Sequence, residues 1–340
     1  MRHARIKAEG VGCYHVVSRI VDRNFRLDDA EKEIFRGMMR RAEVFCGVRI
    51  LTYAILANHF HLLVEVPLRG EIDEAELIRR VTALYGRIYA NNMARQWHVW
   101  RKNNMAYLVD EQQSKLKMRM GDVSAFIKTL KQRYSMSYNG RHERTGTLWE
   151  DRFKSVLVEN AIDAKATVAA YIDLNPVRAK IVEDPKDYRW SGYGEACGGS
   201  ARAREGLIAV HASRGLEQLG KWNSVAKRYR ILLYAQGKAR HAIDGDTVLR
   251  PGIAAAEAER VFEKSGKLPL QQVLRCRVRY FTDGLAFGRN AFINDVFNKN
   301  RRHFGPKRKD GARKMRIAEW GDLRVARALR ITPVFVPNVL

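Results

Sequence analysis

The sequence predicts an α+β fold. Residues 13–21 alternate in character as a strand does, and residues 51–67 read as a buried strand, a turn and a second strand. Between them, Asp28 or Asp29 caps a helix that runs to Cys46. This strand–helix–strand–strand order is the opening of a ferredoxin-like sandwich, an antiparallel sheet with helices on one face.

The following elements complete a predicted domain of residues 1–195. Residues 70–122 are helical and basic and read as an insertion. Ser124–Asn139 is predicted as an amphipathic helix and Phe153–Val158 as the last strand of the sheet. A further helix then runs to Asn175-Pro176, where the proline ends it.

The C-terminal part is predicted as a connector over 196–250 and a mainly α-helical, basic region over 251–340. Leu268–Phe281, a turn at 282–284 and Leu285–His303 resemble a helix-turn-helix. Its second helix would present side chains of the types that read base edges or hold phosphates: Arg289, Asn290, Asn294 and Lys299. A plain basic helical hairpin is the alternative.

The charge balance indicates a nucleic-acid partner. The chain of 340 residues holds 62 Lys and Arg against 37 Asp and Glu, a formal net charge of +25. Such an excess points to a polyanion, nucleic acid before a membrane surface. The 4 cysteines form no CxxC pair, which argues against a zinc finger and a disulfide framework. No secretory signal or membrane-spanning run is evident, so a cytoplasmic, nucleoid-associated protein is expected.

Two histidines in the second strand of residues 51–67 are candidate metal ligands. His59 and His61 are two apart, so their side chains leave the strand on the same face as Leu63 and could hold one divalent ion. With 9 histidines in the chain, this spacing also arises by chance.

Tyr171 and Asn175 are the second candidate pair. They lie four residues apart, which places them one turn from each other on a helix. A phenol is a possible nucleophile and an amide oxygen a hard ligand, whereas a buried tyrosine and a helix-capping asparagine are the structural alternative. Because Pro176 follows, Asn175 is expected at a fraying helix end.

Three motifs together resemble a known family. LANHFHLLVEVP, GTLWEDRFKSVLVEN and AAYIDLNPVRAKIVEDPKDYRWSGY, in this order, are similar to the REP-associated tyrosine transposases of the single-tyrosine HUH superfamily. The resemblance covers roughly residues 12–195, although the insertion at 70–122 is less typical. It implies that His59, His61 and Asn175 bind the metal and that Tyr171 takes a 5′-phosphate. Tyr134 and Tyr138 fall outside the nucleophile motif and are interpreted as packing or DNA-stacking residues.

The metal and DNA partners follow from these residues. Two imidazoles and an amide oxygen without a thiolate favour Mg or Mn over structural zinc. Arg19, Lys131, Arg152 and Lys154 are candidate DNA-binding residues, with a solvated surface charge as the alternative for each. Arg23 and Arg178 could also clamp phosphates, but a solvated surface charge is the favoured interpretation for these two. The expected partner is single-stranded or hairpin DNA; the sequence leaves open a monomer or a homodimer.

The leading hypothesis is a metal-dependent tyrosine transposase that nicks and rejoins single-stranded or hairpin DNA. The alternative is a catalytically retired, transposase-derived nucleic-acid-binding regulator. A hydrolase that uses water is a third possibility, but it leaves Tyr171 without a role. Because all catalytic motifs precede residue 180, a fragment that ends near residue 200 is expected to fold and to cleave by itself.

Overall fold

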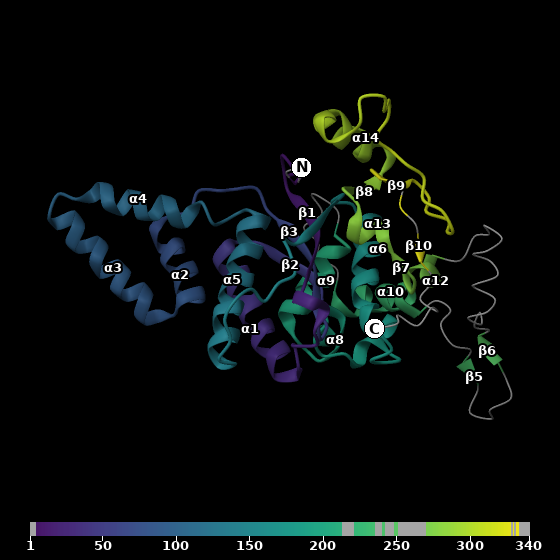
Figure 1. Cartoon of the computed structure of the whole chain (residues 1–340), viewed down its shortest axis with the longest axis horizontal. Coiled ribbons are helices and arrows are strands. Elements are labelled where there is room, and N and C mark those ends of the chain that lie inside the picture. The colour runs from purple at the N-terminus through teal and green to yellow at the C-terminus, as the bar shows by residue number, and fades with distance from the viewer. Residues whose placement is uncertain are drawn as a thin grey trace.

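The computed structural model of the chain describes residues 5–212, 221–234, 240–241, 248–250, 270–327, 329 and 331–332 (Figure 1). Parts of the predicted connector and C-terminal region, including the expected helix start at Leu268, lie outside the described residues. No helix among those described is long and apolar enough to cross a bilayer.

Six strands form the main sheet, in the order β2-β3-β1-β4-β8-β9. They are β1 (Gly12–Arg19), β2 (Arg49–Ile55), β3 (His59–Val66), β4 (Lys154–Val158), β8 (Ala286–Arg289) and β9 (Leu323–Val325). β1 pairs antiparallel with β3 and β4, β2 pairs antiparallel with β3, and β8 runs parallel to β4. The first four strands have the ferredoxin-like arrangement, so the predicted α+β fold is confirmed.

One face of the sheet packs against α1 (Asp29–Cys46) and α5 (Val123–Arg141). α1 begins where the Asp28 carboxylate accepts a hydrogen bond from the Glu31 backbone N–H at 2.8 Å. It ends at Gly47, whose φ of +62° lies in the left-handed region that glycine adopts without strain. The apolar stripe of each helix is buried against β1 and β3.

Helices also cover the other face. They are α6 (Ile162–Asp173), α9 (Ala201–Val210) and α10 (Trp222–Tyr234). Every residue of β1 before Arg19 is buried, so apolar side chains leave this strand on both sides. Cys13 and Leu63 pack in the second core, whereas Tyr14 and Leu62 pack in the first. The prediction of helices on one face is wrong, because strands that are apolar on both faces need cover on both.

The insertion at 70–122 is helical, as predicted. It consists of α2 (Glu74–Tyr85), α3 (Arg87–Lys102) and α4 (Ala106–Lys117), which project as an arm away from the sheet (Figure 1). Trp97 of α3 is fully buried, and its indole N–H donates to Gln112 of α4 at 2.5 Å. The buried side chains of the arm continue the first core, and α2 packs against α1.

The helix-turn-helix predicted for 268–303 is not formed by the described part of that segment. It holds α12 (Leu270–Leu274), β7 (Arg277–Val278), α13 (Arg279–Asp283), β8 and α14 (Asn290–Lys299). β8 pairs with β4, so this segment completes the main sheet and is not a separate helical domain. The apolar residues after Gly284, Leu285–Phe287, fit a buried strand as well as a helix, an ambiguity that short apolar runs always carry.

The remaining short elements lie around these layers. They are α7 (Asn175–Arg178), α8 (Gly192–Cys197), β5 (Arg240–His241), β6 (Val248–Arg250) and β10 (Ile331–Thr332), with 3-10 turns at Val21–Arg23, Pro185–Asp187 and Arg301–His303.

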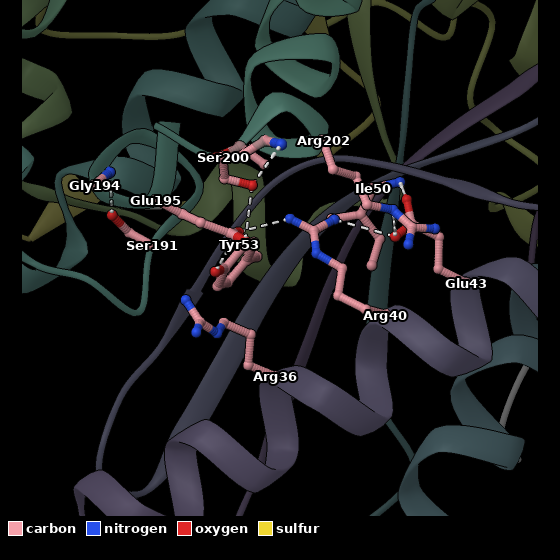
Figure 2. A network of polar contacts seen from close by, with 12 residues as sticks. Arg36, Arg40, Glu43, Ile50, Tyr53, Ser191, Gly194, Glu195, Ser200 and Arg202 are labelled. Atoms are coloured by element: carbon pink, nitrogen blue, oxygen red, sulfur yellow. Dashed lines mark hydrogen bonds and ion pairs between the residues drawn. The ribbon is translucent and has the colours of Figure 1, made fainter. Parts of the chain in front are cut away.

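A polar network joins α1 to α8 and α9 (Figure 2). The Glu195 carboxylate accepts hydrogen bonds from Arg40 and from the Tyr53 hydroxyl, both at 2.7 Å. The Glu43 carboxylate pairs with Arg40 and with Arg202, both at 3.1 Å. These contacts and the packing of α9 and α10 make residues 201–210 and 222–234 part of the domain, so the prediction of a connector over this stretch is wrong.

Candidate active site

The histidine pair lies on β3, in the middle of the sheet. His59 stands opposite Arg19 of β1, and His61 stands opposite Val17. The two imidazole rings are 5.1 Å apart between centroids, and His61 is buried while His59 is half-buried. They share the face of the sheet that carries Leu63, as the strand alternation predicts.

The tautomer of His61 follows from its neighbour His15 on β1. His15 Nδ1 lies 2.7 Å from the carbonyl oxygen of Phe281, which can only accept, so this nitrogen carries a proton. In a neutral ring His15 Nε2 is then an acceptor, and it lies 2.9 Å from His61 Nδ1. His61 Nδ1 therefore donates, and His61 Nε2 keeps the lone pair that binds a metal ion.

His59 has the same tautomer as His61, but a different neighbour determines it. The Asn58 amide nitrogen donates to the carbonyl oxygen of Arg23 at 3.0 Å, which turns the amide oxygen toward His59 Nδ1 at 2.6 Å. His59 Nδ1 therefore donates, and its Nε2 is the nitrogen with the lone pair. Both histidines thus have Nε2 as the possible metal ligand.

The three imidazoles are neutral at neutral pH. Burial lowers the pKa of His15 to about 4 and that of His59 to about 3, and it holds the pKa of His61 well below its usual value. Nearby cations, including Arg178, lower all three values further. Neutral imidazole is the protonation state that a metal ligand needs.

Tyr171 lies on α6 beside the histidines. Its ring centroid is 6.3 Å from that of His61 and 6.1 Å from that of His15. The side chain is 2% exposed, because Phe281 of α13 packs against its ring at 4.9 Å. The structure therefore brings the histidine pair and the predicted nucleophile together, under a cover supplied by the C-terminal part of the chain.

Arg178 completes this cover. Its guanidinium carbon lies 3.9 Å from the centroid of the Tyr171 ring. One guanidinium nitrogen donates to the backbone oxygen of Tyr171 and another to that of Leu274, both at 2.7 Å. The interpretation of Arg178 as a solvated charge is therefore wrong: the residue connects α7, α6 and α12.

Asn175 begins α7 and does not fray. Pro176 occupies the first turn of that short helix, where its missing N–H costs nothing. The Asn175 amide nitrogen donates to the backbone oxygen of Ile172 at 3.0 Å, and the side chain is buried. Its amide oxygen makes no hydrogen bond with the described residues and is the atom that could bind a metal ion.

The donor set fits a divalent ion bound by nitrogen and oxygen. It would consist of Nε2 of His59, Nε2 of His61 and the amide oxygen of Asn175. Within the described part of the chain, no three or more His, Cys, Asp or Glu side chains are grouped to hold a metal ion. Any metal held here therefore depends on an amide or on solvent for its remaining ligands.

The predicted DNA-binding residues fall into two groups. Arg19 lies on β1, Lys131 on α5 and Arg152 in the segment that leads into β4. Lys154 begins β4 and pairs with Asp283 at 2.6 Å.

The C-terminal group is engaged within the chain. Arg289 pairs with Glu159 at 2.5 Å, and Lys299 pairs with Glu9 and Asp295, both at 3.0 Å. The Asn294 side chain accepts hydrogen bonds from the backbone of Gly311 and Ala312 and donates to the Asn290 side chain. These contacts give the four residues structural roles.

The two other tyrosines pack in the first core. Tyr134 is fully buried and donates to Glu31 at 2.6 Å, and Tyr138 is buried beside it. Of the two interpretations left open, packing is the one that this geometry supports.

Sequence reasoning missed His15, Phe281 and Asp173. His15 shares a strand face with Arg19, a signal that could have placed it beside the histidine pair. Phe281 carried no such signal, because its contact with Tyr171 joins segments more than a hundred residues apart.

Asp173 is a buried structural anchor of α6. It accepts from the Thr52 hydroxyl, the Tyr193 backbone N–H and the Tyr229 hydroxyl, and burial raises its pKa to about 7 despite these donors.

Comparison with known proteins finds a match to a family model in the first third of the chain. Residues 11–119 match the model of the family described as transposase IS200 like. This stretch includes His59 and His61 and ends before Tyr171 and Asn175. A solved structure of a REP-associated tyrosine transposase bound to a REP hairpin matches with 13% identity and a TM-score of 0.39, over 74% of this chain and 100% of that chain. The comparison with curated proteins gave no match.

Residues 11–119, the stretch that carries the histidine pair, are thus similar to the transposases described as IS200 like. The resemblance deduced from the three motifs is confirmed to that extent.

Proposed function

We propose that this chain cleaves and rejoins a DNA strand, with Tyr171 as the nucleophile. The observation that carries the proposal is the meeting of three separate segments at His61 of β3. Between ring centroids, His61 lies 5.1 Å from His59, 5.1 Å from His15 of β1 and 6.3 Å from Tyr171 of α6. The family of residues 11–119 supports a DNA-processing role, and the net charge of +25 suits a polyanionic substrate.

The reaction balances without an external energy source. The Tyr171 oxygen attacks the scissile phosphorus and loses its proton, while the bond from phosphorus to the 3′ oxygen breaks and that oxygen gains a proton. The product is a 5′-phosphotyrosine and a free 3′-hydroxyl. Rejoining is the reverse attack by a 3′-hydroxyl, so the phosphoester bond is conserved.

We further propose that His59, His61 and Asn175 hold a divalent ion, Mg or Mn. When bound, such an ion would neutralise charge on the scissile phosphate. The protein's own contribution is the choice of tautomer: His15 and Asn58 accept from the Nδ1 atoms of His61 and His59, so the Nε2 atom of each ring stays deprotonated.

Covalent attachment tests the proposal. The wild-type chain incubated with Mn²⁺ and single-stranded or hairpin oligonucleotides should yield a protein–DNA adduct that survives denaturation. Tyr171→Phe should abolish the adduct and leave binding intact, whereas Tyr107→Phe, a change at an exposed tyrosine of the arm, should not affect it. An adduct formed by Tyr171→Phe would refute the assignment.

A retired, DNA-binding regulator is the second candidate. The observation in its favour is the burial of Tyr171 under Phe281 and Arg178, which shields the phenol from a substrate. The same assay decides, because a regulator would bind DNA and form no adduct on any oligonucleotide.

A further inference from the structure

A concave surface lies between α5 and the segment 147–153 that leads into β4. It encloses about 730 Å³. Four cations line it, Arg5, Lys128, Lys131 and Arg152, against the two acids Glu150 and Asp151. We call this surface the α5 groove.

The cations of the α5 groove are held mainly by uncharged partners. Arg5 donates to the backbone oxygen of Phe153 at 2.6 Å, and its guanidinium carbon lies 3.4 Å from the centroid of that ring. Lys131 donates to the backbone oxygen of Asp151 at 2.9 Å. Lys128 and Arg152 make no hydrogen bond or ion pair with the described residues. Backbone carbonyls orient a cation but do not neutralise it.

Burial and neighbouring positive charges lower the pKa values of cations in the α5 groove. Burial lowers the pKa of Lys131 to about 8; the charge of Asp151 opposes this, and the charge of Arg5 lowers the pKa with a smaller effect than that of Asp151. Burial likewise lowers the pKa of Arg5 to about 10, with Arg152 adding to the effect. Asp122, the acid that acts on Arg5, is already paired with Lys7 at 2.5 Å. A bound anion would relieve this repulsion.

An indole forms one wall of the groove. Trp149 donates through its ring nitrogen to the Ser135 hydroxyl at 2.8 Å, which fixes the ring. The ammonium of Lys131 lies 5.2 Å from the centroid of this ring. Trp149 is itself 7% exposed, so it shapes the wall of the groove and leaves little of its ring for base stacking.

The groove adjoins the end of the sheet that carries the histidines. Trp149 forms an isolated bridge with Ile20, and the Glu150 backbone N–H donates to the Arg19 backbone oxygen at 3.0 Å. Arg19 is the residue that stands opposite His59. A strand whose phosphate reached His59 would therefore have its neighbouring phosphates near this segment.

We propose that the α5 groove binds a phosphodiester of the DNA strand next to the cleavage site. Lys131 and Arg152 supply the charge, Arg5 supports them, and Trp149 supplies the apolar wall. This inference rests on the proposed function for its partner, DNA, and adds the second point at which the strand is held.

The test is the salt dependence of single-strand binding by the full chain. Affinity for a single-stranded thymidine oligonucleotide is measured in chelator, where no cleavage occurs, over a range of salt concentrations. Lys131→Ala with Arg152→Ala should lower the slope of log affinity against log salt by about 1.4, since each lost phosphate contact removes about 0.7. Lys131→Arg alone should retain the wild-type slope.

A matched pair of substitutions controls for total charge. Arg95→Ala with Lys102→Ala removes two exposed cations from α3 of the arm and should leave the slope unchanged. Both double variants should melt at the wild-type temperature. Equal slopes for all proteins, or equal losses in the two double variants, would overturn the α5 groove as a specific site.

The outcome is separable from that of the adduct assay. A slope lost only in the groove variant, with no adduct from the wild-type chain, would keep the groove and remove the cleavage proposal. An adduct from the wild-type chain, together with a wild-type slope in the groove variant, would keep the cleavage proposal and remove the α5 groove.

Discussion

At the scale of single residues, hydrogen bonds to neutral partners determine which nitrogen each histidine presents. The Phe281 carbonyl fixes the proton on His15, and His15 in turn fixes the proton on His61. The Asn58 amide does the same for His59. The geometry of the candidate metal ligands therefore depends on residues that would not touch the metal.

Substitution of His15 should weaken metal binding without removing a ligand. His15→Ala leaves His61 Nδ1 without its acceptor, so the ring is free to turn and to change tautomer. We expect the affinity for Mn²⁺ to fall about 10–100-fold, as for other substitutions behind a metal ligand. Calorimetric titration of the full chain with Mn²⁺ measures it, and His98→Ala, at an exposed site on the arm, is the matched control. An unchanged affinity of His15→Ala for Mn²⁺ would show that His15 does not orient His61 for metal binding.

At the scale of elements, buried polar groups set how the helices attach to one another. Glu31 of α1 accepts hydrogen bonds from Tyr134 and Arg141 of α5, at 2.6 Å each, and its carboxylate lies 2.8 Å from the imidazole of His142. Burial by itself would raise the pKa of Glu31, but these partners outweigh it and hold the pKa below the usual value of 4.5. The ionised carboxylate therefore fastens α5 to α1.

Glu31→Gln should destabilise the chain in a pH-dependent way. Loss of the charge leaves Arg141 without its ion pair and weakens the hydrogen bond from Tyr134, so we expect a loss of about 1–3 kcal/mol at neutral pH. The pKa of Glu31 is lower in the folded state than in the unfolded state. The extra stability of the wild-type chain over Glu31→Gln is therefore complete above pH 4.5, and it is lost as the pH falls through the folded-state pKa.

Urea unfolding of both proteins at several pH values measures this difference. Glu33→Gln, at a half-buried acid of the same helix whose ion pairs are with Arg36 and Arg189, is the control. A difference in stability that stays constant from neutral pH into acid would contradict the role of the Glu31 charge.

At the scale of the whole molecule, the C-terminal segment and the domain of residues 1–195 share one sheet and one core. β8 pairs with β4, and Phe281 and Phe287 are fully buried in the second core together with Tyr171. This changes the expectation for a shortened chain, because the predicted self-sufficient fragment would expose the face that these residues cover.

A chain that ends after residue 212 should fail to fold cooperatively. Loss of Phe281 and Phe287 each costs about 3–5 kcal/mol, which together reaches the total stability of a typical domain. Thermal unfolding followed by circular dichroism should show a broad or absent transition. In the full chain Phe287→Ala should lower the melting temperature, and Arg302→Ala, at an exposed site, should not. A fragment that melts as sharply as the full chain would restore the two-part organisation.

Much of the fold and the site was predictable from local pattern. Strand alternation placed His59 and His61 on one face, helix caps located α1, and the spacing of Tyr171 and Asn175 placed them one turn apart. These features depend on the backbone periods of 2.0 and 3.6 residues, which neighbouring residues alone determine. The similarity of residues 11–119 to the IS200-like transposases was recognisable for the same reason, since the motif LANHFHLLVEVP in this stretch is short and continuous.

Only the tertiary structure decided the cover of Tyr171, the tautomers of the histidines and the attachment of the C-terminal segment. Each depends on a contact between distant residues: Phe281 with Tyr171 and His15, Arg178 with Leu274, and β8 with β4. The apolar run Leu285–Phe287 is compatible with a strand and with a helix, and its pairing with β4 makes it a strand. Local sequence determines which faces are apolar, whereas the partner that covers each face is determined by packing of the whole chain.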